Sequence, residues 1–304
     1  MKASFARMLK ALAASLNLVL ALGLLQPASH DAALEKERFW VMKTHASWKN
    51  DMVIMGDSRI YRGVSPQEME SILAGWRILN FGYSSGGLNK EMFKEAEARL
   101  DPKSSNKTII LGISPHSLTP SAEKNTMFRE EKARSKTYIF LRRRAGSLLR
   151  FFQPVDIKEF VDTIRNKIAK KSRSQHELFF NNGWVESWDY PERKSLALKT
   201  YATIFSSNQV SPKLVDGLIQ QVREWTRQGI QVYGFRPPSC PEMAALENEK
   251  SGFSEPVLVK RFQEAGGIWL PFTESYHSYD GCHLHARDAR KLSREMAMMI
   301  KTGR

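Results

Sequence analysis

The sequence contains little cysteine and no repeated or compositionally biased segment. Cys240 and Cys282 are the only cysteines among 304 residues, and neither lies in the spacing typical of a metal site. The 13 prolines and 18 glycines are scattered along the chain. These absences argue against a repeat protein. They also lead us to expect no metal site and no cofactor.

Acidic residues are outnumbered, at 32 against 46 lysines and arginines, which gives a formal net charge of +14. Basic residues are dense between Lys124 and Arg173. Two interpretations stay open: an ordinary solvated face, or attraction to anionic lipid headgroups or acidic polysaccharide. Nucleic acid is not an expected partner, because no nucleic-acid-binding motif accompanies the charge.

Long apolar runs are also absent, and the nearest approach is at the N-terminus. Lys2, Arg7 and Lys10 precede an apolar run from Ala11 to Leu25. The run is short for a membrane span, although the stretch from Phe5 to Leu25 approaches the roughly 20 residues that a span requires.

We therefore predict a signal anchor in residues 1–30, with a cleaved signal peptide as the close alternative and an ordinary core helix as the less favoured one. The expected location is a single pass in the inner (cytoplasmic) membrane with the rest of the chain in the periplasm, because the basic residues precede the run. A cleaved segment would instead make the protein secreted.

Five short apolar runs in the remaining chain, 31–304, are typical of buried strands. They are Met52–Met55, Ile78–Phe81, Thr108–Ile113, Gln231–Phe235 and Ile268–Leu270. Amphipathic helical patterns alternate with these runs. The alternation predicts an α/β fold with a five-stranded parallel sheet covered by helices on both faces.

About ninety residues, 120–210, separate the third predicted strand from the fourth. We expect them to form a helical insertion, with helices over Tyr138–Arg150, Val155–Lys171 and Arg193–Phe205. The insertion leaves from the carboxyl end of the third strand, where open α/β sheets bind ligands. The insertion could cover a ligand site there, or it could lie beside the sheet without taking part in any site.

Two short motifs contain residues that could take part in catalysis. Gly56-Asp57-Ser58 directly follows the first strand, and Asp280 lies three residues before His283, after the fifth strand. A serine, a histidine and a carboxylate can serve as nucleophile, base and orienting acid in acyl transfer. His277 and His285 flank the second motif, but only His283 has the three-residue spacing from Asp280.

In these motifs the chain resembles the SGNH/GDSL hydrolase superfamily, from about Asp51 to the C-terminus without the insertion. The resemblance implies a flavodoxin-like three-layer α/β/α sandwich with Ser58 as nucleophile, His283 as base and Asp280 as its orienter. It also implies that Gly82, which follows Asn80-Phe81, donates its N–H to an oxyanion together with the Ser58 N–H.

The third block of that superfamily is altered here. Where Gly-x-Asn-Asp is usual, the chain reads Gly112-Ile113-Ser114-Pro115-His116. Ser114 or His116 is the expected substitute for the missing asparagine donor. With its apparent anchor, the chain is similar to the divergent membrane-anchored branch that includes teichoic-acid D-alanyl transfer proteins and alginate-type O-acetyltransferases.

The resemblance implies an exported serine enzyme that transfers an acyl group to or from a cell-envelope glycan. The alternatives are a simple GDSL-type esterase or lipase, and a degenerate SGNH module that binds envelope polysaccharide. Expected partners are an acylated small molecule or glycan, the membrane, and a membrane-bound acyl-donor protein.

Three arginines, His116 and the two cysteines are the remaining candidate functional residues. Arg59 and Arg62, beside the nucleophile, could hold an anionic substrate or form surface ion pairs. His116 and Arg236, after the third and fourth strands, could likewise face the substrate. Cys240 and Cys282 could form a disulfide or remain buried thiols.

Overall fold

The computed structural model describes residues 2–25, 32–47, 49–144, 174–192 and 194–303, and the chain falls into two compact units. The first unit comprises residues 1–42 and 134–172. It contains α1 (Lys2–Leu25), most of α2 (Ala32–His45) and α8 (Lys136–Arg144). Within this unit, Arg142 forms an ion pair with Glu37 at 2.6 Å. The predicted helix 155–171 lies outside the described residues.

The predicted membrane anchor is wrong. Among the described residues, no helix combines the length and the apolar character needed to cross a membrane. α1 is 24 residues long. However, it carries Lys10, Ser15 and Asn17 within or beside its apolar stretch, and such polar side chains are costly in hydrocarbon. The predicted location, a single membrane pass with the rest of the chain in the periplasm, depended on this anchor and is therefore also wrong.

The second unit, residues 43–133 and 173–304, contains the predicted parallel sheet. Its strands are β1 (Met52–Met55), β2 (Ile78–Asn80), β3 (Thr108–Gly112), β6 (Gln231–Phe235) and β7 (Ile268–Trp269). The strand order is β2-β1-β3-β6-β7, and every neighbouring pair is parallel. All five predicted strands are therefore confirmed, each within one residue of its predicted bounds.

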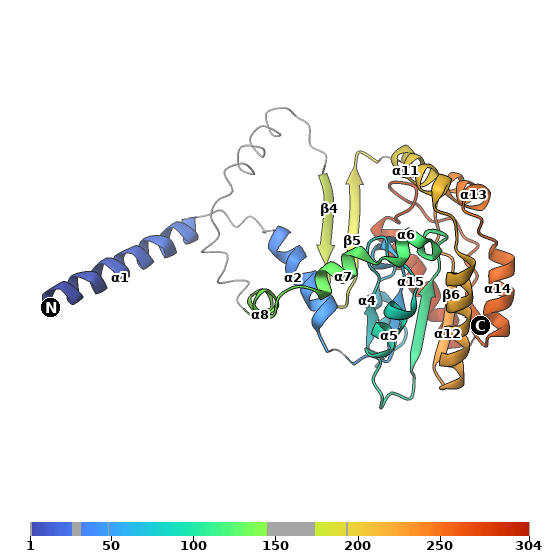
Figure 1. Ribbon diagram of the computed structural model, residues 1–304, viewed down its shortest axis with the longest axis horizontal. Helices are drawn as coiled ribbons and strands as arrows, with labels where there is room; N and C mark the ends of the chain where they lie inside the picture. The colour runs from blue at the N-terminus through green and yellow to red at the C-terminus, as the bar shows by residue number, and fades with distance from the viewer. Residues whose placement is uncertain (1, 26–31, 48, 145–173, 193, 304) are drawn as a thin grey trace. The chain divides into compact units, whose positions relative to one another are not determined.

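Helices cover both faces of this sheet. α3 (Ser58–Gly63), α4 (Pro66–Glu70) and α15 (Ala286–Thr302) pack on one face. α5 (Lys90–Glu97), α12 (Pro212–Arg227) and α14 (Glu255–Glu264) pack on the other, where Figure 1 shows α12 and α14 beside β6. The fold is the predicted three-layer α/β/α sandwich.

The period-two alternation of the strands divides the core between these two layers. Met52 and Ile54 of β1 belong to the same buried cluster as Met296 of α15. Val53 lies between them in the strand and is equally buried, so it faces the opposite layer. Both faces of β1 are thus removed from water, as its uninterrupted apolar sequence predicts.

The segment between β3 and β6 is not wholly helical. It contains the short helices α6 (Pro120–Glu123) and α7 (Thr126–Lys132), an antiparallel hairpin of β4 (Ser174–Phe179) and β5 (Val185–Tyr190), and α11 (Lys194–Ser207). The hairpin corrects the expectation of a helical insertion. Its turn holds Gly183 at a φ of +88°, which the Asn-Gly pair before Trp184 permits.

The hairpin packs against the part of the sheet that carries Ser58. The N–H of Asn80, at the end of β2, donates to the carbonyl of Asn182 at 2.9 Å. The Trp184 indole is buried and donates to the carbonyl of Arg62 in α3, also at 2.9 Å. Because the turn reaches both β2 and α3, it covers one flank of the first motif. The sequence also did not predict α13 (Pro241–Lys250), which follows β6.

Candidate active site

The turn between β1 and α3 presents Ser58 at the carboxyl edge of the sheet. Gly56 has a φ of +152°, and a Cβ added there would lie 2.3 Å from the Ile60 side chain and 2.8 Å from the Gly112 carbonyl oxygen. Only glycine fits this turn without displacement. Asp57 then caps α3, because its Oδ1 accepts the Arg59 N–H at 2.9 Å. Ser58 is consequently the first residue of the helix.

The loop after β7 fixes Asp280 and His283 relative to each other. Asp280 Oδ1 accepts the backbone N–H groups of Cys282 at 2.9 Å and His283 at 2.8 Å. Burial alone would raise the pKa of Asp280, but the His283 imidazole and these two backbone donors lower it to about 2. Asp280 is therefore a carboxylate at neutral pH and can only accept hydrogen bonds.

The structure brings all three predicted residues together. His283 Nδ1 lies 2.6 Å from Asp280 Oδ2, and His283 Nε2 lies 2.8 Å from Ser58 Oγ. Because Asp280 is an acceptor, Nδ1 is the donor in its contact with Asp280, and Nε2 is placed to accept from the Ser58 hydroxyl. The predicted contacts are thus present in the order that acyl-transfer chemistry requires. All three residues are partly exposed, so a substrate can reach them from solvent.

The expected oxyanion donors are arranged differently from the prediction. Gly82 N–H donates to Asn80 Oδ1 at 3.0 Å, so it is engaged inside the protein in this conformation. Asn80 is itself fixed, because its amide donates to the carbonyls of Ile60 and Val64. By contrast, no hydrogen bond pairs the Ser58 N–H with any described residue. Of the two predicted backbone donors, Ser58 N–H and Gly82 N–H, only the Ser58 N–H is thus unpaired among the described residues.

Ser114 is not a substitute donor. Its hydroxyl is completely buried and donates to Asp57 Oδ2 at 2.5 Å, while its oxygen accepts the Ser117 N–H at 3.1 Å. Ser114 therefore holds the residue that caps α3, and its proton is not available to a substrate. Asp57 has the structural role that a turn residue would have.

His116 lies in the same buried region, with its ring 5.7 Å from that of Tyr201 in edge-to-face geometry. Its Nδ1 has no hydrogen-bond partner among the described residues. Burial lowers the pKa of His116, so the ring is neutral at pH 7. The residue is only 6% exposed, so its ring is largely closed off from solvent.

Arg59 and Arg236, two of the predicted substrate-binding arginines, bind the same buried carboxylate. Arg59 Nη2 lies 2.5 Å from one oxygen of Glu247, and Arg236 Nη2 lies 2.9 Å from the other. Burial disfavours the charge of Arg59, but Glu247 keeps its pKa above the ordinary value. Since Glu247 and the Arg59 side chain are almost fully inaccessible, this ion pair ties α3 to α13 and does not face a substrate.

Arg62 is also engaged by protein groups. Its guanidinium donates to the Tyr279 hydroxyl at 3.0 Å and to Glu177 of β4 at 2.8 Å. The Tyr279 hydroxyl is 2.8 Å from Ser187 Oγ of β5, and the Tyr279 ring stacks on His283 with centroids 5.9 Å apart. The hairpin therefore supports the histidine through Tyr279, which the sequence analysis did not identify.

The two cysteines are free thiols in this structure and lie in one buried cluster with Met243. Burial raises the pKa of Cys282 to about 12 and also raises that of Cys240. Both are consequently protonated at neutral pH and unreactive as nucleophiles. The disulfide is absent, and the thiols pack as small apolar groups.

Comparison with known proteins gives no family. No protein-family model and no curated protein matches this chain. One solved structure that aligns with it is described as "a putative platelet activating factor from Streptococcus pneumonia". That structure shares 10% sequence identity over 95% of this chain and 98% of its own, with a TM-score of 0.39. At these values the likeness carries no argument about function.

Proposed function

We propose that this protein is a serine esterase or acyltransferase that forms an acyl-enzyme on Ser58. The observation that carries the proposal is the continuous contact from Ser58 Oγ to His283 Nε2 at 2.8 Å and from His283 Nδ1 to Asp280 at 2.6 Å. The two ends of this array are more than 220 residues apart in sequence. Serine turns are common, but a serine that meets an oriented imidazole is typical of nucleophilic catalysis.

The geometry supports a two-step reaction. Ser58 Oγ attacks the carbonyl carbon of an acyl ester while its proton passes to His283 Nε2. The tetrahedral intermediate then collapses, the ester C–O bond breaks, and the leaving alkoxide takes that proton from His283. An acceptor hydroxyl subsequently attacks the acyl-Ser58, gives its proton to His283, and releases the acyl group as Ser58 Oγ recovers the proton. Asp280 remains ionised throughout and stabilises the imidazolium.

The negative charge of the intermediate needs hydrogen-bond donors. The Ser58 N–H is available, and the N-terminus of α3 adds a favourable backbone dipole. We propose Gly82 N–H as a second donor, which would leave Asn80 Oδ1 when the oxyanion forms. This exchange is compatible with a slow enzyme, since each missing donor costs on the order of a hundredfold or more in rate.

The choice between water and a glycan hydroxyl as acceptor is a finer proposal. We propose O-acyl transfer to or from a cell-envelope glycan. The support for it is the altered third block, Gly112-Ile113-Ser114-Pro115-His116, a departure from ordinary esterases in which the sequence is similar to the O-acetyltransferase branch. Ester hydrolysis shares the same first step. Product analysis with an acyl ester donor, with and without a glycan acceptor, distinguishes them, because transfer yields an acylated glycan and hydrolysis yields only free acid.

The decisive experiment is active-site labelling with a fluorophosphonate probe. Ser58 should displace fluoride and form a covalent phosphonyl ester, which mass spectrometry can locate. Ser58→Ala and His283→Ala should abolish labelling. Ser71→Ala, which removes an exposed hydroxyl at the end of α4, and His176→Ala on β4 should not.

Failure of the wild type to label, in a protein whose fold is intact by circular dichroism, would remove the enzymatic proposal. The engaged states of Gly82 N–H and Ser114 Oγ favour one specific alternative in that case. It is an SGNH-like module that has lost turnover and only binds an acylated polymer. Binding of acetylated polysaccharide by an unlabelled protein would support that alternative.

A further inference from the structure

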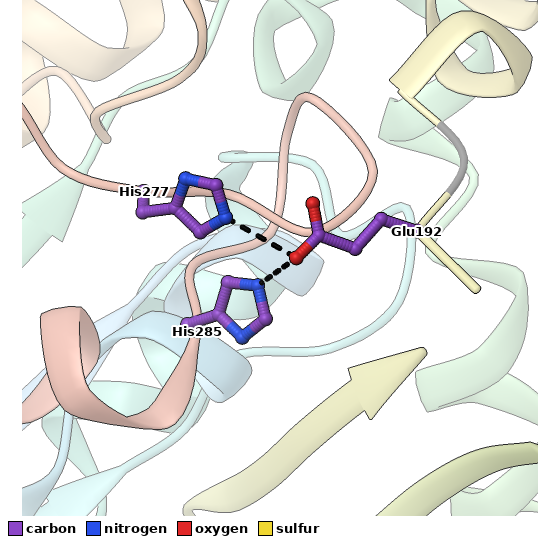
Figure 2. Close-up of side chains that lie close together, drawn as sticks. All are labelled: Glu192, His277 and His285. Carbon is purple, nitrogen blue, oxygen red and sulfur yellow. Dashed lines mark hydrogen bonds and ion pairs between the residues drawn. The ribbon is translucent and has the colours of Figure 1, made fainter. Parts of the chain in front are cut away.

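Glu192, His277 and His285 form a second cluster of titratable side chains, outside the array that contains Ser58. Figure 2 shows the two imidazoles lying one above the other, with the Glu192 carboxylate approaching from a different segment. Their ring centroids are 4.6 Å apart and the planes differ by 14°. Glu192 follows β5, whereas both histidines lie between β7 and α15.

The metal-binding atoms of these side chains converge on one point. His277 Nε2 lies 3.2 Å and His285 Nε2 lies 2.9 Å from the same oxygen, Glu192 Oε1. One donor atom from each residue can be chosen so that all three lie within 4.8 Å of one another. In a tetrahedral zinc site with bonds of about 2.0–2.1 Å, neighbouring ligand atoms are about 3.3 Å apart. The two nitrogen–oxygen separations, 3.2 Å and 2.9 Å, are close to that value.

Backbone contacts within the loop place His277 beside His285. His285 N–H donates to the His277 carbonyl at 3.0 Å, and Ser278 pairs with Leu284 in an isolated antiparallel bridge. These contacts hold the two histidines side by side on adjacent strands of one loop, without help from Glu192. Only the carboxylate must come from elsewhere, and it is 85 residues from His277 and 93 from His285 in sequence.

Ion pairing by itself does not explain why Glu192, His277 and His285 lie together, because such exposed pairs stabilise a protein little. The side chains of His277, Glu192 and His285 are 52%, 38% and 27% exposed. Exposed pairs of this kind contribute little to stability in water. Two imidazoles and one carboxylate are, however, the protein ligands of open zinc sites, in which the fourth position is left to water or a substrate.

We propose that Glu192, His277 and His285 bind a divalent transition-metal ion, with zinc as the best fit to the ligand set. The ion would join the end of β5 to the loop that carries Asp280 and His283. Tyr279 lies between this metal site and the candidate active site, because its ring contacts those of both His283 and His285. Bound zinc would thereby restrain the loop and help to position His283, whichever acyl substrate is used.

The test is calorimetric titration of zinc chloride into the full chain, first stripped of metal with a chelating resin. The wild type should bind one zinc ion, and His277→Ala, His285→Ala and Glu192→Gln should each weaken binding at least about tenfold. His176→Ala is the matched control, because it removes an imidazole that stacks on Trp188 outside the cluster. This control should bind as the wild type does.

A second arm separates the cluster from the only other candidate group of metal ligands in the described residues, Asp280, Cys282 and His283. His283→Ala should leave zinc binding unchanged. At the same zinc concentration, zinc should also raise the melting temperature of the wild type more than that of Glu192→Gln, an exposed substitution that preserves the fold. Loss of binding in His283→Ala with retention in His277→Ala would overturn the proposal. Absence of zinc binding by the wild type at millimolar concentration would do so as well.

Discussion

The loop between β7 and α15 carries two histidine–carboxylate clusters that differ in how the carboxylate reaches the ring. Asp280 and His283 are three residues apart, and their side chains are 21% and 13% exposed. Glu192 reaches His277 and His285 from another part of the chain, and this cluster is more exposed. One cluster is local and sheltered, whereas the other is assembled from distant segments at the surface.

The difference shows that nearby backbone groups can fix the orientation of a carboxylate in a site. Two N–H groups of the loop hold one oxygen of Asp280, and the other oxygen lies 2.6 Å from His283 Nδ1. This fixes the tautomer before any substrate binds. Among the described residues, no backbone N–H holds the Glu192 carboxylate in this way, and Glu192 follows the end of β5. We infer that the first cluster is preorganised for proton transfer and that the second is suited to a bridging ligand.

The largest predicted effect is the loss of the nucleophile or the base. Ser58→Ala and His283→Ala should each lower kcat on an acyl ester by about 10⁴-fold or more. Both residues are partly exposed, so truncation opens no large core cavity and the fold should persist. Steady-state kinetics with a chromogenic ester measures the effect. A fully active Ser58→Ala protein would contradict the assignment.

Asp280→Asn should have the next largest effect, with kcat reduced by about 10²- to 10⁴-fold. The asparagine amide can donate to His283 Nδ1, which would shift the ring proton to Nε2 and remove the acceptor for Ser58. KM should change little, because Asp280 contacts the base and not the substrate. A rise in KM at constant kcat would instead place Asp280 in substrate binding.

The sequence predicted the strands and the Ser58–His283–Asp280 array well, because their determinants are local or periodic. Uninterrupted apolar runs such as Met52–Met55 are typical of parallel strands buried on both faces. The common direction of the strands then brings the turn after β1 and the loop after β7 to the same edge. β7 is three strands away from β1 in the sheet, so the shared edge alone does not bring Ser58 to His283. The pairing of these two residues was implied by the resemblance of their motifs to those of the SGNH/GDSL superfamily.

The remaining contacts depend on side chains far apart in sequence and were not predictable from spacing. Nothing near Arg59 or Arg236 indicates that both would bind the buried Glu247 of α13. The hairpin was missed because its strands contain polar residues such as Ser187 and Glu177, which obscure the alternation. Gly183, after two asparagines, was the available indication of a turn.

The next prediction concerns the stability of the fold and the side chain of Asp51, which lies just before β1 at the amino edge of the sheet. Like Asp280, Asp51 has a lowered pKa. Hydrogen bonds from the Arg77 side chain are the main cause that lowers the pKa of Asp51 to about 2. Asp51→Asn should reduce the free energy of unfolding by about 1–2 kcal/mol at pH 7, a value reduced for screening because Arg77 is half exposed.

The pH dependence of that difference has a definite sign. A carboxylate with a lowered pKa stabilises the folded state fully above its unfolded pKa of about 3.9, and the contribution disappears as the pH falls through about 2. Urea unfolding of the wild type and Asp51→Asn between pH 7 and pH 2 should therefore give curves that converge at the acid end. Parallel curves would show that Asp51 acts through packing and not through its charge.

The smallest predicted effect on activity is that of His285→Ala, the substitution that most directly tests the comparison between the two clusters. His285 lies two residues from His283, but its Nε2 faces Glu192 and its ring meets Tyr279 edge-on, 5.7 Å away. Its loss should loosen the loop without removing the proton acceptor of Ser58. We expect kcat to fall by less than about tenfold, with fluorophosphonate labelling retained but slower. If His285→Ala instead equals His283→Ala in its effect, the two clusters act as one unit, and the base cannot be assigned to His283 alone.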